Sequence, residues 1–218
     1  MVIGGIGRCA AWRREGKYWP VSAAGAISER LAPSLQAREA LAMDSSRRPV
    51  LKLGVVDLGI ETASLPSGIT VDLAVIRHPG ASAIVALYRD GTIALLSQWR
   101  HAIGTWLREI PAGCRAAGED YLACARRELG EETALAAARW DHLGAIVTIP
   151  SFCDERIELF LARDLSVGAG DLDHDEVIRV ARVPLAEAFE MIDRGEIVDA
   201  KTIVALYRAR EFLSRDSA

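Results

Sequence analysis

The chain has 218 residues, and its 26 Lys and Arg side chains against 30 Asp and Glu give a formal net charge of −4 at pH 7. Half of the residues are hydrophobic, which excludes a disordered chain and fits one folded domain with a short appendage. The acidic balance excludes a generally basic nucleic-acid-binding surface, and no run of about 18 apolar residues is present to span a membrane. An anionic substrate would therefore need local arginines or a metal ion to hold it.

Residues 1–45 differ in composition from the rest of the chain. Met43 is followed by a polar segment that ends at Pro49, which marks a boundary. We interpret residues 1–45 as an N-terminal extension that is dispensable, or as the result of a mis-assigned start, with translation beginning at Met43.

The spacing of the four cysteines bears on the cellular compartment. They stand at positions 9, 114, 124 and 153, and they form no C-x-x-C pair and no zinc-ligand pattern. A chain long enough for a real core does not need disulfides. We therefore expect reduced thiols and a cytoplasmic location.

Strand-like alternation follows the N-terminal region. Apolar residues alternate over residues 50–60 and 69–78, so we expect a strand in each range. Residues 82–88 and 92–98 are also strand-like, and the short link between them contains Asp90-Gly91. Because Asp-Gly accepts the positive φ of a tight turn, these two runs predict a β-hairpin.

The second half of the chain mixes helices with strands. A Gly- and Asp-rich stretch over 167–175 predicts a turn region. The periodicity of apolar residues predicts the remaining elements: a helix over 120–133, strands over 140–149, 156–163 and 177–183, and helices over 184–194 and 199–214. This order, without an internal repeat, predicts a mixed α+β sandwich and not a regular βαβ array.

The predicted helix over 120–133 carries a cluster of acidic residues. Glu128 and Glu132 are one turn apart and project side by side, with Glu131 on the flank. Oxygen-only clusters suit hard ions such as Mg²⁺ or Mn²⁺, which also bind substrate phosphates. The alternative is a solvated helix whose acidic side chains simply face water. The neighbouring face is apolar and can dock on a sheet: Leu122, Ala125 and Leu129.

The string from Gly113 to Leu135 resembles the Nudix box, G-x5-E-x7-R-E-U-x-E-E-x-G-U, in which U is a bulky aliphatic residue. The positions that match at the required spacing are Gly113, Glu119, Arg127, Glu128, Leu129, Glu131, Glu132 and Leu135. Ala134 stands where the family has a glycine that leaves the helix with positive φ, so we expect a shifted helix end and an intact site. The resemblance implies an α+β fold: the Nudix α/β/α sandwich with a mixed sheet and an N-terminal β-rich subdomain.

Further motifs resemble those of ADP-ribose pyrophosphatases and related nucleotide-sugar diphosphatases. Residues 98–101 and 109–113 are similar to the Q-(aromatic)-R and E-(aliphatic)-P-A-G motifs of that subfamily. Residues 150–155 and 159–162 are similar to its P-G-x-S-x-E and F-L-A motifs, although Ser151 replaces a glycine. We therefore expect a hydrolase activity of this subfamily.

The resemblance also implies which residues carry the chemistry. A metal ion would be held by Glu128, Glu131, Glu132 and the carbonyl of Ala112. The general base of this subfamily lies on the later loop, which points to Glu155 as the group that activates water. Arg127 would hold the helix and its preceding loop together through Glu119 or a glutamate of the box.

Substrate contacts are implied around the earlier motif. Arg100 is the natural contact for the diphosphate, because a guanidinium binds phosphate oxygens in a bidentate way. Trp99 or Phe152 would border the nucleoside or belong to the core, and we prefer the core interpretation. Glu109 would either position the terminal ribose or form a structural ion pair.

The remaining histidines and cysteines carry less weight. The four histidines show no metal-ligand spacing, so we interpret them as surface or packing residues. Cys114 and Cys153 flank the expected site, but the sequence suggests no histidine partner for nucleophilic catalysis. We interpret both as incidental thiols.

The implied activity is metal-dependent hydrolysis of the diphosphate bond of ADP-ribose or a related nucleoside diphosphate sugar, giving AMP and a sugar phosphate, with Mg²⁺ (or Mn²⁺) as cofactor. One alternative is hydrolysis of GDP-mannose or another nucleotide sugar, and a second is a non-catalytic Nudix domain that senses ADP-ribose. The N-terminal strands of such relatives pair into dimers, so we expect residues 46–81 to dimerise the chain and residues 82–214 to form the hydrolase domain. The expected partners are a small-molecule substrate and a second copy of the chain, without nucleic acid or membrane.

Overall fold

The computed structural model describes residues 46–168 and 178–216. The expectations for the N-terminal extension, for a start at Met43 and for most of the turn region 167–175 lie outside the described residues. None of the described helices is long and apolar enough to cross a bilayer.

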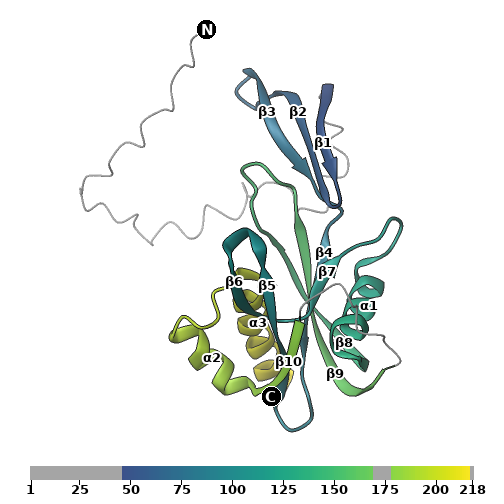
Figure 1. Ribbon diagram of the computed structural model, residues 1–218, viewed down its shortest axis with the longest axis vertical. Coiled ribbons are helices and arrows are strands. Elements are labelled where there is room, and N and C mark those ends of the chain that lie inside the picture. Colours follow the sequence, from purple (N-terminus) through teal and green to yellow (C-terminus); the bar gives the residue numbers. More distant parts are fainter. Residues whose placement is uncertain (1–45, 169–177, 217–218) are drawn as a thin grey trace, which may run out of the picture. The chain divides into compact units, whose positions relative to one another are not determined.

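The described residues form strands, three α-helices and one short 3₁₀ turn (Figure 1). The strands are β1 (Ser46–Leu53), β2 (Val56–Ser64), β3 (Thr70–Arg77), β4 (Ala81–Ala86), β5 (Thr92–Arg100), β6 (Thr105–Glu109), β7 (Ala112–Cys114), β8 (Leu135–Val147), β9 (Arg156–Val167) and β10 (Ile178–Pro184). The helices are α1 (Tyr121–Thr133), α2 (Leu185–Asp193) and α3 (Ala200–Asp216), and the 3₁₀ turn is His101–Ile103.

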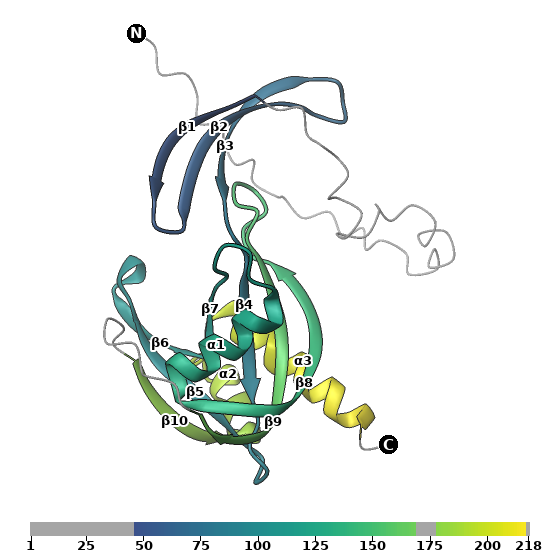
Figure 2. The ribbon, with the colours of Figure 1, turned by 90° about the vertical axis from the view of Figure 1, so that its right-hand side faces the viewer.

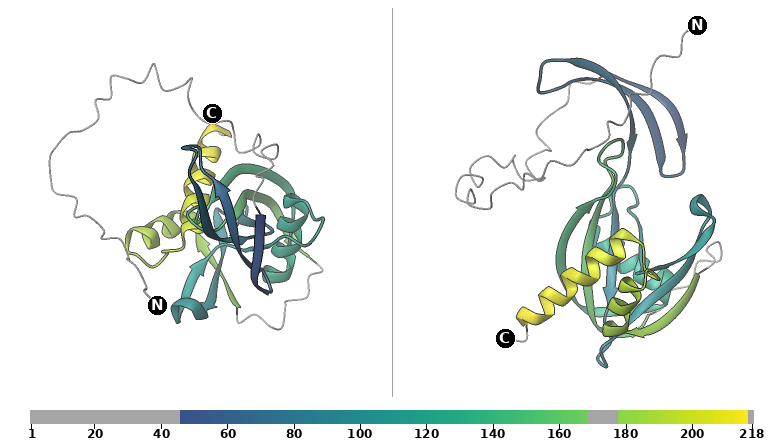
Figure 3. Two further views of the ribbon diagram at one scale, coloured as in Figure 1. Left: turned by 90° about the horizontal axis from the view of Figure 1, so that it is seen from above. Right: turned by 90° about the vertical axis from the view of Figure 1, so that its left-hand side faces the viewer.

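The strands form three sheets, and one of them is mixed. β1, β2 and β3 form an antiparallel meander, and β10, β5 and β6 form a second antiparallel sheet. The third has the order β7-β4-β9-β8, and only β4 and β9 run parallel in it. Figure 2 shows α1 in front of this sheet, and the right-hand view of Figure 3 shows α2 and α3 on the opposite side. The predicted α+β sandwich with a mixed sheet is confirmed.

Strand β4 is buried along its whole length because helices cover both faces of its sheet. Successive side chains of a strand point to opposite faces. Ala83 and Val85 therefore pack into the core beneath α2 and α3, and Ile84 and Ala86 pack beneath α1. The predicted apolar face of α1 docks in this second core: Leu122, Ala125 and Leu129. This packing fixes the direction in which the opposite, acidic face of α1 points.

Two details of the predicted strands are wrong. The predicted strand over 50–60 is broken by a turn at Gly54, where φ is +56°, and its two parts pair with each other as β1 and β2. The predicted hairpin has its turn at Gly91, with φ of +83°, but β4 and β5 enter different sheets and share only the bridge between Leu87 and Ile93. The reason is that both edges of β4 are taken by β7 and β9.

Helix α1 begins and ends at residues with local capping interactions. The carboxylate of Asp120 accepts a hydrogen bond from the backbone N–H of Ala123 at 2.8 Å. Ala134 itself adopts the left-handed conformation, with φ 54° and ψ 30°, and its N–H donates to Gly130 at 2.8 Å. The expected shift of the helix end is therefore wrong, because the alanine tolerates the conformation at a cost of about 1–2 kcal/mol.

Replacing this alanine should stabilise the protein. In the variant Ala134→Gly we expect the free energy of unfolding to rise by about 1 kcal/mol, because glycine reaches positive φ without a Cβ clash. For a chain of this size that corresponds to a rise of roughly 2–4 °C in the midpoint of thermal unfolding. The matched control is Asp164→Gly, where φ is 52°. Its gain should be smaller since Asp enters this region more readily. A lower midpoint for A134G would contradict the strain at this helix end.

Candidate active site

A glycine of the strand before α1 lies against an acidic side chain of that helix. A Cβ built on Gly113 in β7 would stand 2.1 Å from Cδ of Glu128. Any other residue at position 113 would displace the carboxylate, so this close approach of loop and helix requires glycine. The Glu128 carboxylate thus rests directly on the backbone of the loop.

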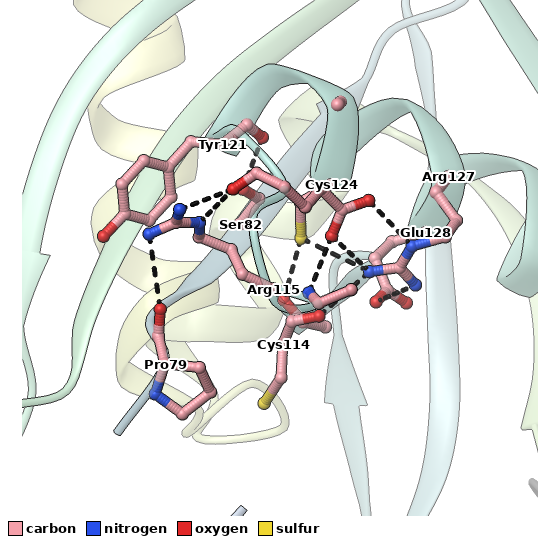
Figure 4. Close-up of polar contacts among 12 residues, drawn as sticks. Pro79, Ser82, Cys114, Arg115, Tyr121, Cys124, Arg127 and Glu128 are labelled. Carbon is pink, nitrogen blue, oxygen red and sulfur yellow. Dashed lines mark hydrogen bonds and ion pairs between the residues drawn. The ribbon is translucent and has the colours of Figure 1, made fainter. Parts of the chain in front are cut away.

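Arg127 connects the acidic face of α1 to the preceding loop (Figure 4). Its guanidinium donates to Glu119 at 2.9 and 3.0 Å, to Glu128 at 2.6 Å and to Glu131 at 2.8 Å. It also donates to the backbone carbonyl of Cys114 at 2.9 Å. Hydrogen bonds to these carboxylates, that to Glu119 foremost, raise the pKa of Arg127 and outweigh the opposing effect of burial. One cation therefore offsets part of the repulsion among three acidic side chains.

Glu119 is the strongest of these anchors on the loop side. The hydrogen bonds from Arg127, followed by one from the backbone N–H of Ala116 at 2.9 Å, lower the pKa of Glu119 to about 2. Its own backbone carbonyl accepts from the guanidinium of Arg115 at 2.8 Å. The loop between β7 and α1 is thus closed by charged hydrogen bonds at both of its ends.

Glu132 binds the loop one helical turn after Glu128. It is only 5% exposed, and its carboxylate accepts from the backbone N–H of Ala112 at 2.8 Å. The two glutamates face adjacent residues of one loop, as expected for side chains spaced i,i+4. The acidic residues of α1 therefore do not simply face water, and the solvated-helix alternative is wrong.

The chemistry of these groups fits a hard divalent cation. Glu128, Glu131, Glu132 and the carbonyl of Ala112 offer only oxygen donors, which Mg²⁺ and Mn²⁺ prefer. Within the described residues, no three His, Cys, Asp or Glu side chains already converge as a finished metal site. Arg127 holds two of the carboxylates instead. The metal ligands accordingly stay a prediction that the donor set supports.

Arg100 and Glu109 form a bidentate ion pair beside this loop. The guanidinium donates to the two carboxylate oxygens at 2.7 and 2.6 Å, and Lys201 of α3 contacts the same carboxylate. Burial, at 1% exposure, would raise the pKa of Glu109, but Arg100 and Lys201 together bring it below its ordinary value. These contacts support the interpretation of Glu109 as a member of a structural ion pair. Sequence reasoning missed Lys201 as a partner because it lies 92 positions away from Glu109.

The two aromatic residues considered for the nucleoside lie at the surface. Trp99 is 43% exposed and Phe152 is 47% exposed, so the preferred core interpretation is wrong for both. Trp99 packs edge-to-face on Trp106, with ring centroids 5.9 Å apart, across the paired strands β5 and β6. Trp106 was not singled out from the sequence, although its position opposite Trp99 in a hairpin was the available signal.

Glu155 lies beside the thiol of Cys114 and the ring of His78. One carboxylate oxygen accepts from the hydroxyl of Thr148 at 2.5 Å, and the other stands 3.5 Å from Nε2 of His78. The same nitrogen is 3.6 Å from Sγ of Cys114, so the expectation that this thiol has no histidine partner is wrong. Burial, helped by the charges of Glu155 and Glu128, raises the pKa of Cys114 to about 11. A protonated thiol is a poor nucleophile, which supports its interpretation as incidental to the chemistry.

Comparison with known proteins identifies the family of the chain. Residues 77–206 match the NUDIX domain family. The chain is 38% identical to an ADP-ribose pyrophosphatase of Bacillus subtilis (strain 168) and 37% identical to a methanol dehydrogenase activator of Bacillus methanolicus. Each of these alignments covers 70% of this chain and 83% of the relative. A crystal structure of an ADP compounds hydrolase superposes with a TM-score of 0.68 at 19% identity, covering 79% of this chain and 95% of that one.

The low pKa of Glu119 predicts an acid-sensitive loop. Its carboxylate stabilises the folded state fully above its ordinary pKa of 4.5, and this contribution is lost as the pH falls toward the folded value of about 2. Glu119→Gln should therefore be less stable than the parent near neutral pH, and the difference should shrink on acidification through that window. Urea unfolding over a pH series measures this difference. The matched control is Glu211→Gln, an exposed acid whose nearest ion pair, to Arg215, is 3.9 Å long. A difference for E119Q that does not change with pH would contradict the assignment.

Proposed function

The chain belongs to the NUDIX family, and on that premise we propose that it is a pyrophosphohydrolase that cleaves the diphosphate bond of ADP-ribose or a related nucleoside diphosphate sugar. The products are AMP, or another nucleoside monophosphate, and a sugar phosphate. The observation that carries the proposal is the acidic face of α1, with Glu128 and Glu132 held against the loop that precedes the helix.

The carboxylates of α1 define the place of the diphosphate. We propose that Glu128, Glu131, Glu132 and the Ala112 carbonyl hold Mg²⁺ or Mn²⁺. When bound, such an ion neutralises phosphate charge and lowers the pKa of water. The role of Arg127 is to orient the glutamates, which its four-way contacts support. An acidic protein can in this way accept an acidic substrate.

The groups around the α1 loop supply the remaining functions. Glu155 accepts the proton of the attacking water, a role suited to a half-buried carboxylate next to the acidic helix. Arg100 contacts the diphosphate, since its pair with Glu109 uses Nε and one terminal nitrogen and does not involve the other. Exposed Trp99 is available to border the nucleoside.

Two alternatives differ in substrate or in class. Hydrolysis of GDP-mannose or another nucleotide sugar uses the same acidic helix and differs only in the groups that contact base and sugar. A non-catalytic sensor of ADP-ribose is the second alternative, and it draws support from the relative named as an activator of another enzyme. The complete set of acidic side chains on α1 favours hydrolysis, because binding alone does not need it.

We further propose that the enzyme is a cytoplasmic homodimer joined through residues 46–81. Free thiols at Cys114, Cys124 and Cys153 support a reducing compartment. The sheet of β1–β3 and its turns expose many large apolar side chains: Val50, Leu51, Leu53, Val55, Val56, Leu65, Ile69 and Leu73. An apolar surface of this kind is typical of an interface between chains.

The activity is tested by a hydrolysis panel. We expect release of AMP from ADP-ribose that depends on added Mg²⁺ or Mn²⁺ and exceeds release of nucleotide from GDP-mannose, NADH and diadenosine polyphosphates. Glu132→Gln should lower turnover by orders of magnitude with the fold intact, because it removes a charged oxygen ligand. Circular dichroism provides the check on folding. Unchanged turnover of E132Q would contradict the assignment of Glu132 as a metal ligand. Tight binding of ADP-ribose without any hydrolysis would favour the non-catalytic sensor.

The dimer is tested by light scattering coupled to size-exclusion chromatography. We expect twice the monomer mass for the parent chain and a shift toward monomer for Leu53→Asp, which places a charge in the apolar surface. The matched control is Val167→Asp, an exposed apolar residue at the end of β9 that should leave the mass unchanged. A monomeric parent would refute this part of the proposal.

A further inference from the structure

Strand β3 ends beside the loop that carries Glu155. The backbone N–H of Ile76 donates to the carbonyl of Phe152 at 2.8 Å, and the N–H of Asp154 donates back to Ile76 at 3.3 Å. The side chain of Asp154 then accepts from the guanidinium of Arg77 at 2.9 Å and from the backbone N–H of His78 at 2.8 Å. Four hydrogen bonds thus hold the loop before β9 to the end of β3.

These contacts place the imidazole of His78 between two loops of the candidate active site. Its side chain is only 9% exposed. Nε2 stands 3.5 Å from Glu155, on the loop before β9, and 3.6 Å from Sγ of Cys114, which directly follows Gly113. The ring therefore spans the gap between the proposed water-activating carboxylate and the loop on which Glu128 rests.

The other ring nitrogen is used to orient the imidazole. The backbone N–H of Gly80 donates to Nδ1 of His78 at 3.1 Å, so a neutral ring carries its proton on Nε2, the nitrogen that faces Glu155 and Cys114. Gly80 has φ of +87°, and a Cβ there would stand 2.7 Å from the hydroxyl oxygen of Tyr121. The turn that aims this N–H is thus specified both by backbone conformation and by close packing on α1.

Glu155 has a donor on each side of its carboxylate. Thr148 donates to Oε2, and the Nε2–H of His78 faces Oε1. The distance of 3.5 Å to Oε1 is longer than an ordinary hydrogen bond, and the sulfur at 3.6 Å competes for the same proton. A small rotation of either side chain would bring the Nε2–H within hydrogen-bond distance of Oε1.

We propose that His78 is a positioning residue for the hydrolysis: its Nε2–H holds the Glu155 carboxylate at a set place relative to the loop of Cys114 and the acidic helix. This inference rests on the proposed function of Glu155. It adds the side chain of the residue that directly follows β3, the last strand of the N-terminal sheet. Misplacing a catalytic group by about 1 Å can cost as much as a hundredfold in rate, so the effect belongs in kcat.

Steady-state kinetics of His78 variants test the proposal. With whichever nucleotide sugar the parent chain hydrolyses, we expect His78→Ala to lower kcat at least tenfold while KM stays within about threefold. His78→Gln, whose amide N–H reaches the place of Nε2, should recover much of kcat. His78→Asn is too short to reach that place and should recover little. The matched control is His142→Ala, because His142 also contacts a glutamate, at 2.6 Å, but on β8 and β9 away from this loop.

The outcomes separate the proposal from the proposed function. Suppose that the parent chain hydrolyses its substrate and that H78A folds. A kcat of H78A within twofold of the parent value would then contradict only the role of His78. A rise in KM at constant kcat would contradict it too. If H78A does not fold, equal kcat values for the Gln and Asn variants contradict it. A parent without any hydrolysis refutes the proposed function. The geometry is then judged by the ¹⁵N resonances of His78, for which the Nε2–H tautomer is expected and the Nδ1–H tautomer would overturn the assignment.

Discussion

The guanidinium of Arg127 is the interaction on which the rest of the candidate active site depends. Glu128 and Glu131 stand on adjacent turns of α1 and Glu119 stands on the loop, and all three accept hydrogen bonds from this one cation. Without it, a helix that presents several carboxylates at the edge of a packed core would lose stability through repulsion and burial. The fifth bond, to the carbonyl of Cys114, makes the same group a structural link between loop and helix. A stable fold and a concentrated negative charge are thus compatible because they share one partner.

The sequence was sufficient for the parts of the fold that depend on local periodicity. The helix over 120–133 is confirmed to within a residue because its apolar face and its cap are encoded within one segment. The separation of β4 from β5 was not predictable, because it depends on which strands occupy the edges of β4, and those strands lie far along the chain. The break at Gly54 was missed since alternation on both sides of a short turn looks like one continuous strand. The pairing of strands that are far apart in the sequence therefore determined the features that the local pattern could not predict.

The candidate active site likewise has a part that local spacing predicts and a part that depends on contacts between distant segments. The acidic residues of α1 and the role of Arg127 as a link are contiguous in sequence, and the spacing alone brings them together. The contact of His78 with Glu155 joins segments 77 positions apart, and the pair of Glu109 with Lys201 joins segments 92 positions apart. Neither His78 nor Lys201 stands at a sequence spacing that would predict its contact. A histidine without a metal-ligand pattern is accordingly interpreted from the sequence as a surface or packing residue, although the fold places His78 beside Glu155 and Cys114.

The contact between Gly113 and Glu128 limits which residues these two positions can accept in evolution. The space that a side chain would need at position 113 is filled by the carboxylate of position 128, so position 113 cannot gain a side chain while that carboxylate keeps its place. A larger residue at position 113 would have to push the Glu128 carboxylate away from the loop, whereas a shorter residue at position 128 would leave room for it. The motif spans a strand, a loop and a helix, and the size of its first residue, Gly113, is constrained by the side chain of Glu128, fifteen positions later.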